Sequence, residues 1–180
     1  RRSSDLAATA LSRMLQCCYE TGNTLYIRML ASYLAERFPG NAEAASGILR
    51  LGKEYFDKGD KDMYMFLYST YLHGFPDDER APGIHYTLAS LKKQDGDTPG
   101  ALADFEVIAK KYAKNQYGLR ALNQLAWHYQ QTNDYARAVE YFTRYVNAAS
   151  PGYEKALAQM TMGGAYKEQG KYAEALQAYA

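Results

Sequence analysis

Residues 120–145 read RALNQLAWHYQQTNDYARAVEYFTRY. On both sides of Asn133 the apolar residues recur at spacings of three and four, which is the period of an amphipathic helix. Asn tolerates the left-handed backbone conformation that often ends a helix, so we expect Asn133 to form a tight turn. This stretch therefore predicts two helices that fold back on each other as a hairpin.

The same pattern returns along the chain with a period of 37 residues. Glycine holds the turn position at Gly22, Gly59, Gly96 and Gly170, and Asn133 fills the remaining place. A period of this length is typical of stacked helical hairpins, because one hairpin alone cannot bury both of its faces. We expect a single repeat array over residues 1–180, with approximate units 8–44, 45–81, 82–118, 119–155 and 156–180, the last one truncated.

Two further columns come into register when the units are aligned on the turn. A small residue stands seven positions before the turn, at Gly52, Ala89, Ala126 and Gly163. An aromatic residue stands nine positions after it, at Tyr68, Phe105, Phe142 and Tyr179. We expect the small residues to let the paired helices approach closely and the aromatic rings to fill the wider gap to the next hairpin. Recurring aromatic positions account for much of the unusual content of 18 tyrosines.

Unit three carries a local signal for the start of its second helix. Thr98 can accept a hydrogen bond from the first turn, and Pro99 follows it directly. Proline is favoured at the first helical position, because its missing N–H has no partner there in any case. The sequence therefore predicts Thr98 as the N-cap and Pro99 as the first helical residue.

These columns resemble the tetratricopeptide repeat family, whose pattern is a Leu-Gly pair, a Tyr, a turn Gly, an Ala, an aromatic residue and a closing Pro. Unit two matches it at Leu51, Gly52, Tyr55, Gly59, Tyr68 and Pro76. The resemblance implies an all-α fold, a right-handed superhelical solenoid of about five helical hairpins. It also implies a non-catalytic scaffold that binds a protein or peptide partner in its concave groove.

The 37-residue form, with Phe-Pro at the ends of units one and two, is similar to repeats of bacterial envelope proteins. That resemblance implies a role in outer-membrane protein assembly, pilus biogenesis or exopolysaccharide secretion. It also implies a periplasmic or outer-membrane-associated location, with the cytoplasm as the alternative.

Charge and motif content exclude several other functions. The chain has 21 basic and 20 acidic residues, and a net charge of +1 gives no field that would attract nucleic acid or an anionic membrane. No apolar run approaches the roughly 20 residues that a membrane-spanning helix needs, so we expect no direct membrane insertion. His73, His85 and His128 show no metal-ligand spacing, and phosphate-binding and nucleophile motifs are absent. We expect no catalytic residue, cofactor or metal, and we do not expect an enzyme.

The resemblance also nominates residues of the partner-binding groove, because the family's inward positions lie at fixed offsets on the first helix of each unit. The principal candidates are aromatic, amide and basic: Tyr19, Lys53, Phe56, Tyr86, Lys93, Arg120, Asn123, Trp127, Gln130 and Lys167. The same offsets include Ser12, Gln16, Leu49, Ser90 and Met160.

Trp127 is the most distinctive of these candidates. Leu125 and Tyr129 hold the core columns of its helix, which leaves Trp127 on another face, and an exposed Trp is a typical binding anchor. The alternative is that Trp127 packs against the neighbouring unit.

Three functional hypotheses follow for the chain. The first is a docking scaffold for a partner segment in the groove. The second is an architectural spacer or self-assembling scaffold, so self-association is possible. The third is a regulatory docking domain attached to an enzyme or secretion channel. Because the chain lacks an initiating Met and a terminal capping helix, we expect it to be a fragment of a larger protein.

Overall fold

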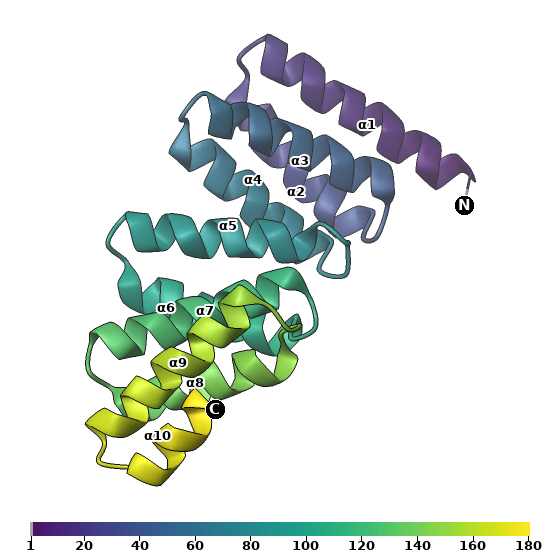
Figure 1. The fold of residues 1–180 in the computed structure, drawn as a ribbon. Coiled ribbons are helices and arrows are strands. Elements are labelled where there is room, and N and C mark those ends of the chain that lie inside the picture. Colours follow the sequence, from purple (N-terminus) through teal and green to yellow (C-terminus); the bar gives the residue numbers. More distant parts are fainter. Residues whose placement is uncertain (1) are drawn as a thin grey trace. The chain divides into compact units, whose positions relative to one another are not determined.

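The structure is a computed structural model that describes the backbone of residues 2–180 and the side chains from residue 5 onward. This described part of the chain contains ten helices and no strand, which confirms the predicted all-α class (Figure 1). In chain order the helices are α1 (Arg2–Glu20), α2 (Thr24–Arg37), α3 (Ala42–Asp57), α4 (Lys61–Gly74), α5 (Ala81–Gln94), α6 (Thr98–Lys111), α7 (Gln116–Gln131), α8 (Tyr135–Ala148), α9 (Tyr153–Glu168) and α10 (Tyr172–Tyr179).

A residue with left-handed backbone ends the first helix of every hairpin, as predicted. The glycines at this position have φ of 69° at Gly22, 73° at Gly59, 86° at Gly96 and 73° at Gly170, and Asn133 has φ of 60°. Glycine adopts this conformation without a Cβ clash, and Asn is the side chain that tolerates it best. The 37-residue period of the sequence is therefore a period of helix-ending turns.

Six of the helices begin with an Asn or Asp side chain that accepts a hydrogen bond from the first turn. These caps are Asn23, Asn41, Asp60, Asp97, Asn115 and Asp134. The predicted cap of α6 was wrong by one residue, because Asp97 accepts from Gly100 N at 3.0 Å and Thr98 is already helical. Pro99 still lies in the first turn, where no backbone N–H donor is needed.

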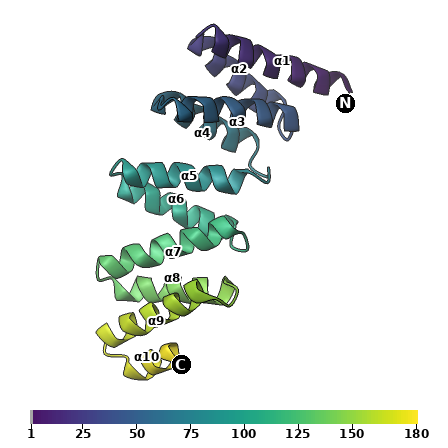
Figure 2. The ribbon, with the colours of Figure 1, turned by 45° about the horizontal axis from the view of Figure 1, so that its top comes forward.

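The contacts divide the chain into two compact units, one up to Leu88 and one from Ala89 onward, with the boundary inside α5. In the first unit, α1 packs against α2 and α3, α3 packs against α4, and α2 packs against α4. In the second unit, α7 packs against α6 and α8, and α9 packs against α8 and α10. Figure 2 shows the helical hairpins from which both units are built.

The small and aromatic columns meet within one hairpin. A methyl group placed on Gly52 would lie 2.5 Å from Cε1 of Tyr68, and one on Gly163 would lie 2.5 Å from Cε1 of Tyr179. The close approach at the small column is confirmed. Each of these two rings packs on the glycine of its own hairpin, a contact that the expected role of the aromatic column in filling the gap to the next hairpin did not include.

Size is complementary in the other hairpins too. The pairs at the same register are Ala89 with Phe105 and Ala126 with Phe142, and the first hairpin has the large residue first, as Leu15 with Ala31. All six of these side chains are almost fully buried. Each hairpin thus carries one small and one large side chain at this position, as expected for a close-packed interior.

Several tyrosines bury the ring and keep the hydroxyl group at an acidic partner. Tyr141 donates to Glu106 Oε1 at 2.9 Å, and Tyr145 donates to Glu154 Oε2 at 3.2 Å. Burial is the main cause that raises the pKa of both phenols above its ordinary value, and the neighbouring carboxylates raise it further. These tyrosines therefore stay neutral hydrogen-bond donors, and they link α8 to α6 and to α9 within the second unit.

Candidate functional site

Trp127 lies on α7 and is partly packed and partly exposed to solvent. Its ring meets Phe142 of α8 edge-on, with centroids 5.8 Å apart and an interplanar angle of 84°. Phe142 is fully buried, whereas 36% of Trp127 is exposed. The ring contact comes from the same hairpin, so the fold holds the indole in place while part of it faces solvent.

Three other candidates share this helix with Trp127. Arg120, Asn123, Trp127 and Gln130 are spaced by three, four and three residues, which places them along one face of α7. Arg120 is exposed, with its guanidinium 5.6 Å from the ring centroid of Tyr117, and Asn123 and Gln130 are half-buried. Oε1 of Gln130 is a buried acceptor that finds no donor among the described residues. The face therefore combines a cation, two amides and an indole.

The candidates on α5 and α9 are less concentrated. Lys93 is exposed and donates from Nζ to Gln124 Oε1 at 2.9 Å, which links α5 to α7 within the second unit. Tyr86 is half-buried and belongs to the first unit. Lys167 and Met160 of α9 are exposed.

In the first unit, Tyr19 belongs to a small polar and aromatic cluster between α1 and α3. Its hydroxyl donates to Glu54 Oε2 at 3.1 Å, and its ring meets Tyr55 edge-on at 5.3 Å. Nζ of Lys58 lies 4.3 Å from the centroid of the Tyr19 ring. The neighbouring Tyr19 side chain is the main cause that raises the pKa of Lys58. Tyr19 is thus committed to contacts within its own unit.

The remaining candidates of the first unit and its boundary differ in the solvent exposure of their side chains. Lys53 is exposed, and Phe56 is 41% exposed, with its ring edge-on to Tyr64 of α4 at 5.1 Å. Gln16, Leu49 and, at the unit boundary, Ser90 are half-buried. Ser12 is only 6% exposed, and its hydroxyl donates to the backbone oxygen of Glu43 at 3.2 Å. Ser12 therefore belongs to the packing of α1 against α3.

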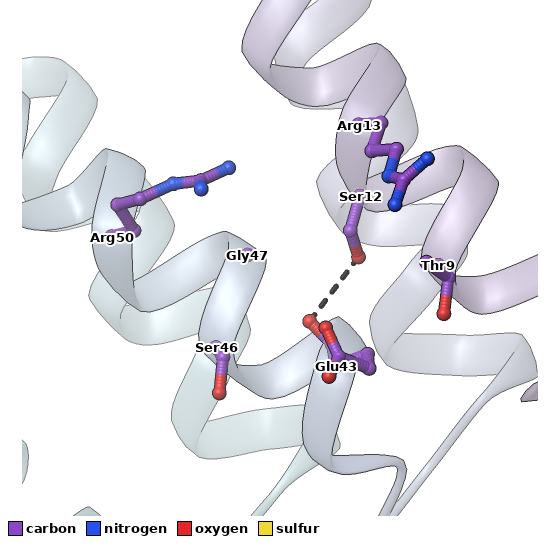
Figure 3. Close-up of a pocket in the computed structure, with 7 residues that line it drawn as sticks. All are labelled: Thr9, Ser12, Arg13, Glu43, Ser46, Gly47 and Arg50. Carbon is purple, nitrogen blue, oxygen red and sulfur yellow. Dashed lines mark hydrogen bonds between the residues drawn. The ribbon is translucent and has the colours of Figure 1, made fainter.

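The sequence interpretation missed a pocket beside Ser12 in the first unit. It has a volume of about 510 Å³ and is lined by Thr9, Ser12 and Arg13 of α1 and by Glu43, Ser46, Gly47 and Arg50 of α3 (Figure 3). Arg13 and Arg50 are 37 residues apart, so they occupy the same place in successive repeats. That spacing was the available signal, but the family offsets selected the preceding residues, Ser12 and Leu49.

The described residues give no sign of a metal centre or a membrane span. No group of three His, Cys, Asp or Glu side chains within residues 2–180 is arranged to bind a metal ion. In the same range, no helix has both the length and the apolar character needed to cross a bilayer.

Comparison with known proteins agrees with the hairpin architecture. Residues 119–150, which contain α7 from its fourth residue onward and all of α8, match the family model described as tetratricopeptide repeat. No curated protein matches the chain.

Solved structures with the same fold include three tetratricopeptide-type proteins of low sequence identity. A crystal structure of MamA is 18% identical with a TM-score of 0.53, over 92% of this chain and 90% of that one. A tetratricopeptide repeat protein from Parabacteroides merdae ATCC 43184 is 18% identical with a TM-score of 0.55, over 96% of this chain and 64% of that one. Tetratricopeptide-like repeats of a putative kinesin light chain from Podosopora anserina are 15% identical with a TM-score of 0.52, over 94% and 89%.

The fold and these likenesses define the class: this is a helical-repeat protein built from tetratricopeptide-type hairpins. Residues 119–150 belong to the tetratricopeptide repeat family, and the chain as a whole has the fold of tetratricopeptide repeat proteins. The predicted family is confirmed for residues 119–150, and the predicted fold is confirmed for the chain. The resemblance to the longer envelope-type repeats stays a prediction.

Proposed function

We propose that this chain is a non-catalytic scaffold that binds a segment of a partner protein on the first helices of its hairpins. The tetratricopeptide fold supports protein–protein interaction as the general function. The observation that carries the proposal is the partial exposure of Trp127, whose ring contacts the buried ring of Phe142.

The physical advantage of such a tryptophan is that little freedom is lost on binding. A Trp side chain buries a large area, and Trp is enriched among the few residues that dominate interface energies. Arg120 and Asn123 lie on the same face of α7 and can pair with polar groups of a bound segment. We therefore assign the anchor of the partner to Trp127 and its orientation to these polar neighbours.

The test is a binding measurement on peptides selected against the whole chain. Trp127→Ala is expected to weaken binding by ~2 kcal/mol, which is about thirtyfold in Kd, while circular dichroism stays helical. Tyr86→Ala tests whether the aromatic candidate of α5 contributes as well. Tyr153→Ala serves as the matched control, because Tyr153 is also aromatic and is more exposed than Trp127. Selected peptides that bind Trp127→Ala as tightly as the wild type would remove Trp127 from the site.

Fluorescence gives a measurement that needs no partner, because Trp127 is the single tryptophan of the chain. With about a third of the residue exposed, we expect an emission that an aqueous quencher reduces partially and a bound peptide protects. Emission that no quencher affects would place the indole in the interior and contradict an anchor role.

We also propose a bacterial envelope location for this scaffold, in outer-membrane protein assembly, pilus biogenesis or exopolysaccharide secretion. The support is the resemblance of the 37-residue units and their Phe-Pro ends to repeats of envelope proteins. Fractionation of the natural protein tests it: recovery in the periplasmic or outer-membrane fraction is expected, and recovery in the cytoplasm alone would contradict it.

Self-association is a second candidate function that one surface favours. Leu25, Tyr26, Met29 and Tyr33 are exposed along α2. One repeat later, Met63 is buried and the guanidinium of Arg28 from α2 covers Phe66, so the equivalent surface of α4 is packed against α2. Light scattering across a concentration series distinguishes the two functions: a mass that rises with concentration, and that Met29→Glu returns to the monomer value, supports self-association.

A further inference from the structure

The pocket between α1 and α3 is built by small residues at the point where the two helices touch. A methyl group placed on Gly47 would lie 3.0 Å from both Cβ and Oγ of Ser12, so no larger residue fits there without movement. Glu43 accepts the hydroxyl of Ser12 through its backbone oxygen, which fixes the base of the pocket. The long side chains that line it therefore stand around an open space.

Two arginines supply the positive charge of this pocket. Figure 3 shows Arg50 extending from α3 toward α1, where Arg13 stands beside Ser12. Both are exposed, and neither guanidinium forms a hydrogen bond or ion pair with another described residue. Arginine presents a planar fork of N–H donors, and among the described residues these two forks have no hydrogen-bond acceptor.

A third arginine of the same unit, Arg80, differs from these two because its guanidinium has hydrogen-bond acceptors. Arg80 donates to Asp78 from Nε at 2.8 Å and from Nη2 at 2.7 Å, and from Nη1 to Ser46 Oγ at 3.0 Å. Its guanidinium is the main cause that holds the pKa of Asp78 well below the usual range, so the pair remains ionised. The charge of Arg80, at the edge of the pocket, is thus neutralised by Asp78. Arg13 and Arg50 have no such acidic partner among the described residues.

We propose that Arg13 and Arg50 bind the carboxylate of an Asp or Glu side chain from the partner segment. An arginine fork accepts a carboxylate through two parallel hydrogen bonds, and an anion between two cations also relieves their mutual repulsion. Glu43 is the acidic residue among those that line the pocket, so two positive charges and one negative charge leave a net +1. A single carboxylate matches this charge, whereas a phosphate dianion would meet stronger repulsion from Glu43.

This inference rests on the proposed scaffold function and adds the chemistry of the partner, namely an acidic segment. The hydroxyl groups of Thr9 and Ser46 line the same pocket and offer further polar contacts to such a segment. The groups are partly solvated, so the site contributes selectivity for acidic residues more than high affinity.

The test uses the whole chain and a short fluorescein-labelled peptide of alternating Asp and Ala, compared with the same peptide carrying Asn in place of Asp. Fluorescence anisotropy is expected to show saturable binding of the Asp peptide and at least about tenfold weaker binding of the Asn peptide. Arg13→Gln and Arg50→Gln are each expected to weaken the Asp peptide about tenfold. Arg144→Gln is the matched control, because Arg144 is also an exposed arginine but lies in the second unit, over the ring of Tyr141.

Three results would overturn the assignment and leave the scaffold function standing: equal binding of the Asp and Asn peptides, unchanged binding by both arginine variants, or no binding of the Asp peptide to a chain that still binds peptides through Trp127. A peptide with phosphoserine in place of Asp that binds more than about tenfold tighter would assign the pocket to phosphate instead. Loss of all peptide binding, including peptides selected on Trp127, would overturn both proposals together.

Discussion

The hairpins α3–α4 and α9–α10 contain the same contact in two different settings. In each, a glycine of the first helix lies against a tyrosine ring sixteen residues later, and a methyl group on either glycine would approach Cε1 to 2.5 Å and Cδ1 to 2.8 Å. The surroundings differ, since Tyr68 is 6% exposed and Tyr179 is 51% exposed. The repeat register therefore determines that the contact forms, and the neighbouring elements determine how rigidly it is held.

The difference has a simple mechanical consequence. α4 packs against α2 as well as α3, so the ring of Tyr68 has protein on several sides and little room to move. Tyr179 is the last residue of α10 and faces solvent over half of its surface. The same added methyl group should thus be costly at Gly52 and mild at Gly163.

The largest effect is expected for Gly52→Leu. The leucine side chain would overlap the ring of Tyr68, which has no room to move aside. Overpacking of this kind destabilises a core by ~3 kcal/mol at the upper end of the usual range. Urea denaturation followed by circular dichroism measures the loss. Phe56→Leu changes an exposed aromatic residue on the same helix and should shift the midpoint much less. Equal midpoints for wild type and Gly52→Leu would disprove the close packing seen here.

A smaller effect is expected for Gly52→Ala, because overpacking is offset by the better helix propensity of Ala, ~1 kcal/mol relative to Gly. We expect a net loss of ~1 kcal/mol. Adding Tyr68→Phe converts the pair to the Ala–Phe type that α7 and α8 carry at Ala126 and Phe142. Without its hydroxyl the ring can shift along its axis, so the double variant should recover at least half of the loss. Strictly additive losses in this double-mutant cycle would show that the two pair types are not interchangeable.

The comparison also shows which parts of the fold the sequence could predict. The five helix-ending turns, from Gly22 to Gly170, were predicted correctly. The requirement for a residue with left-handed backbone is local, so it needs no tertiary information. The cap of α6 was missed by one residue because Asp97 and Thr98 can both accept the same kind of hydrogen bond, and helix ends are the least determined part of a pattern. The period places a ring at each of these positions, but it does not show whether the ring packs on the small residue of its own hairpin or on the next hairpin.

The candidate site was less predictable than the core for a related reason. Trp127 was nominated as a candidate because the core columns left its position unused, and that reasoning needs only the helical period. Arg13 and Arg50 share one repeat position, but they were missed because the family offsets pointed one residue away, to Ser12 and Leu49. Small residues that open a pocket look the same in sequence as small residues that close a helix contact.

The smallest effects are expected at Gly163. Gly163→Leu should destabilise the chain by only ~1 kcal/mol, because Tyr179 can swing into solvent when the leucine takes its place. Gly163→Ala should be close to neutral, since the gain in helix propensity offsets a displacement of the ring. In a repeat stack such changes act mainly on their own hairpin, so hydrogen exchange by mass spectrometry is the appropriate measurement. Protection should fall in residues 153–168 for the Leu variant and stay unchanged in residues 116–131. A loss at Gly163 as large as the loss at Gly52 would mean that solvent exposure of the ring does not matter, and the contrast between the two hairpins would need another cause.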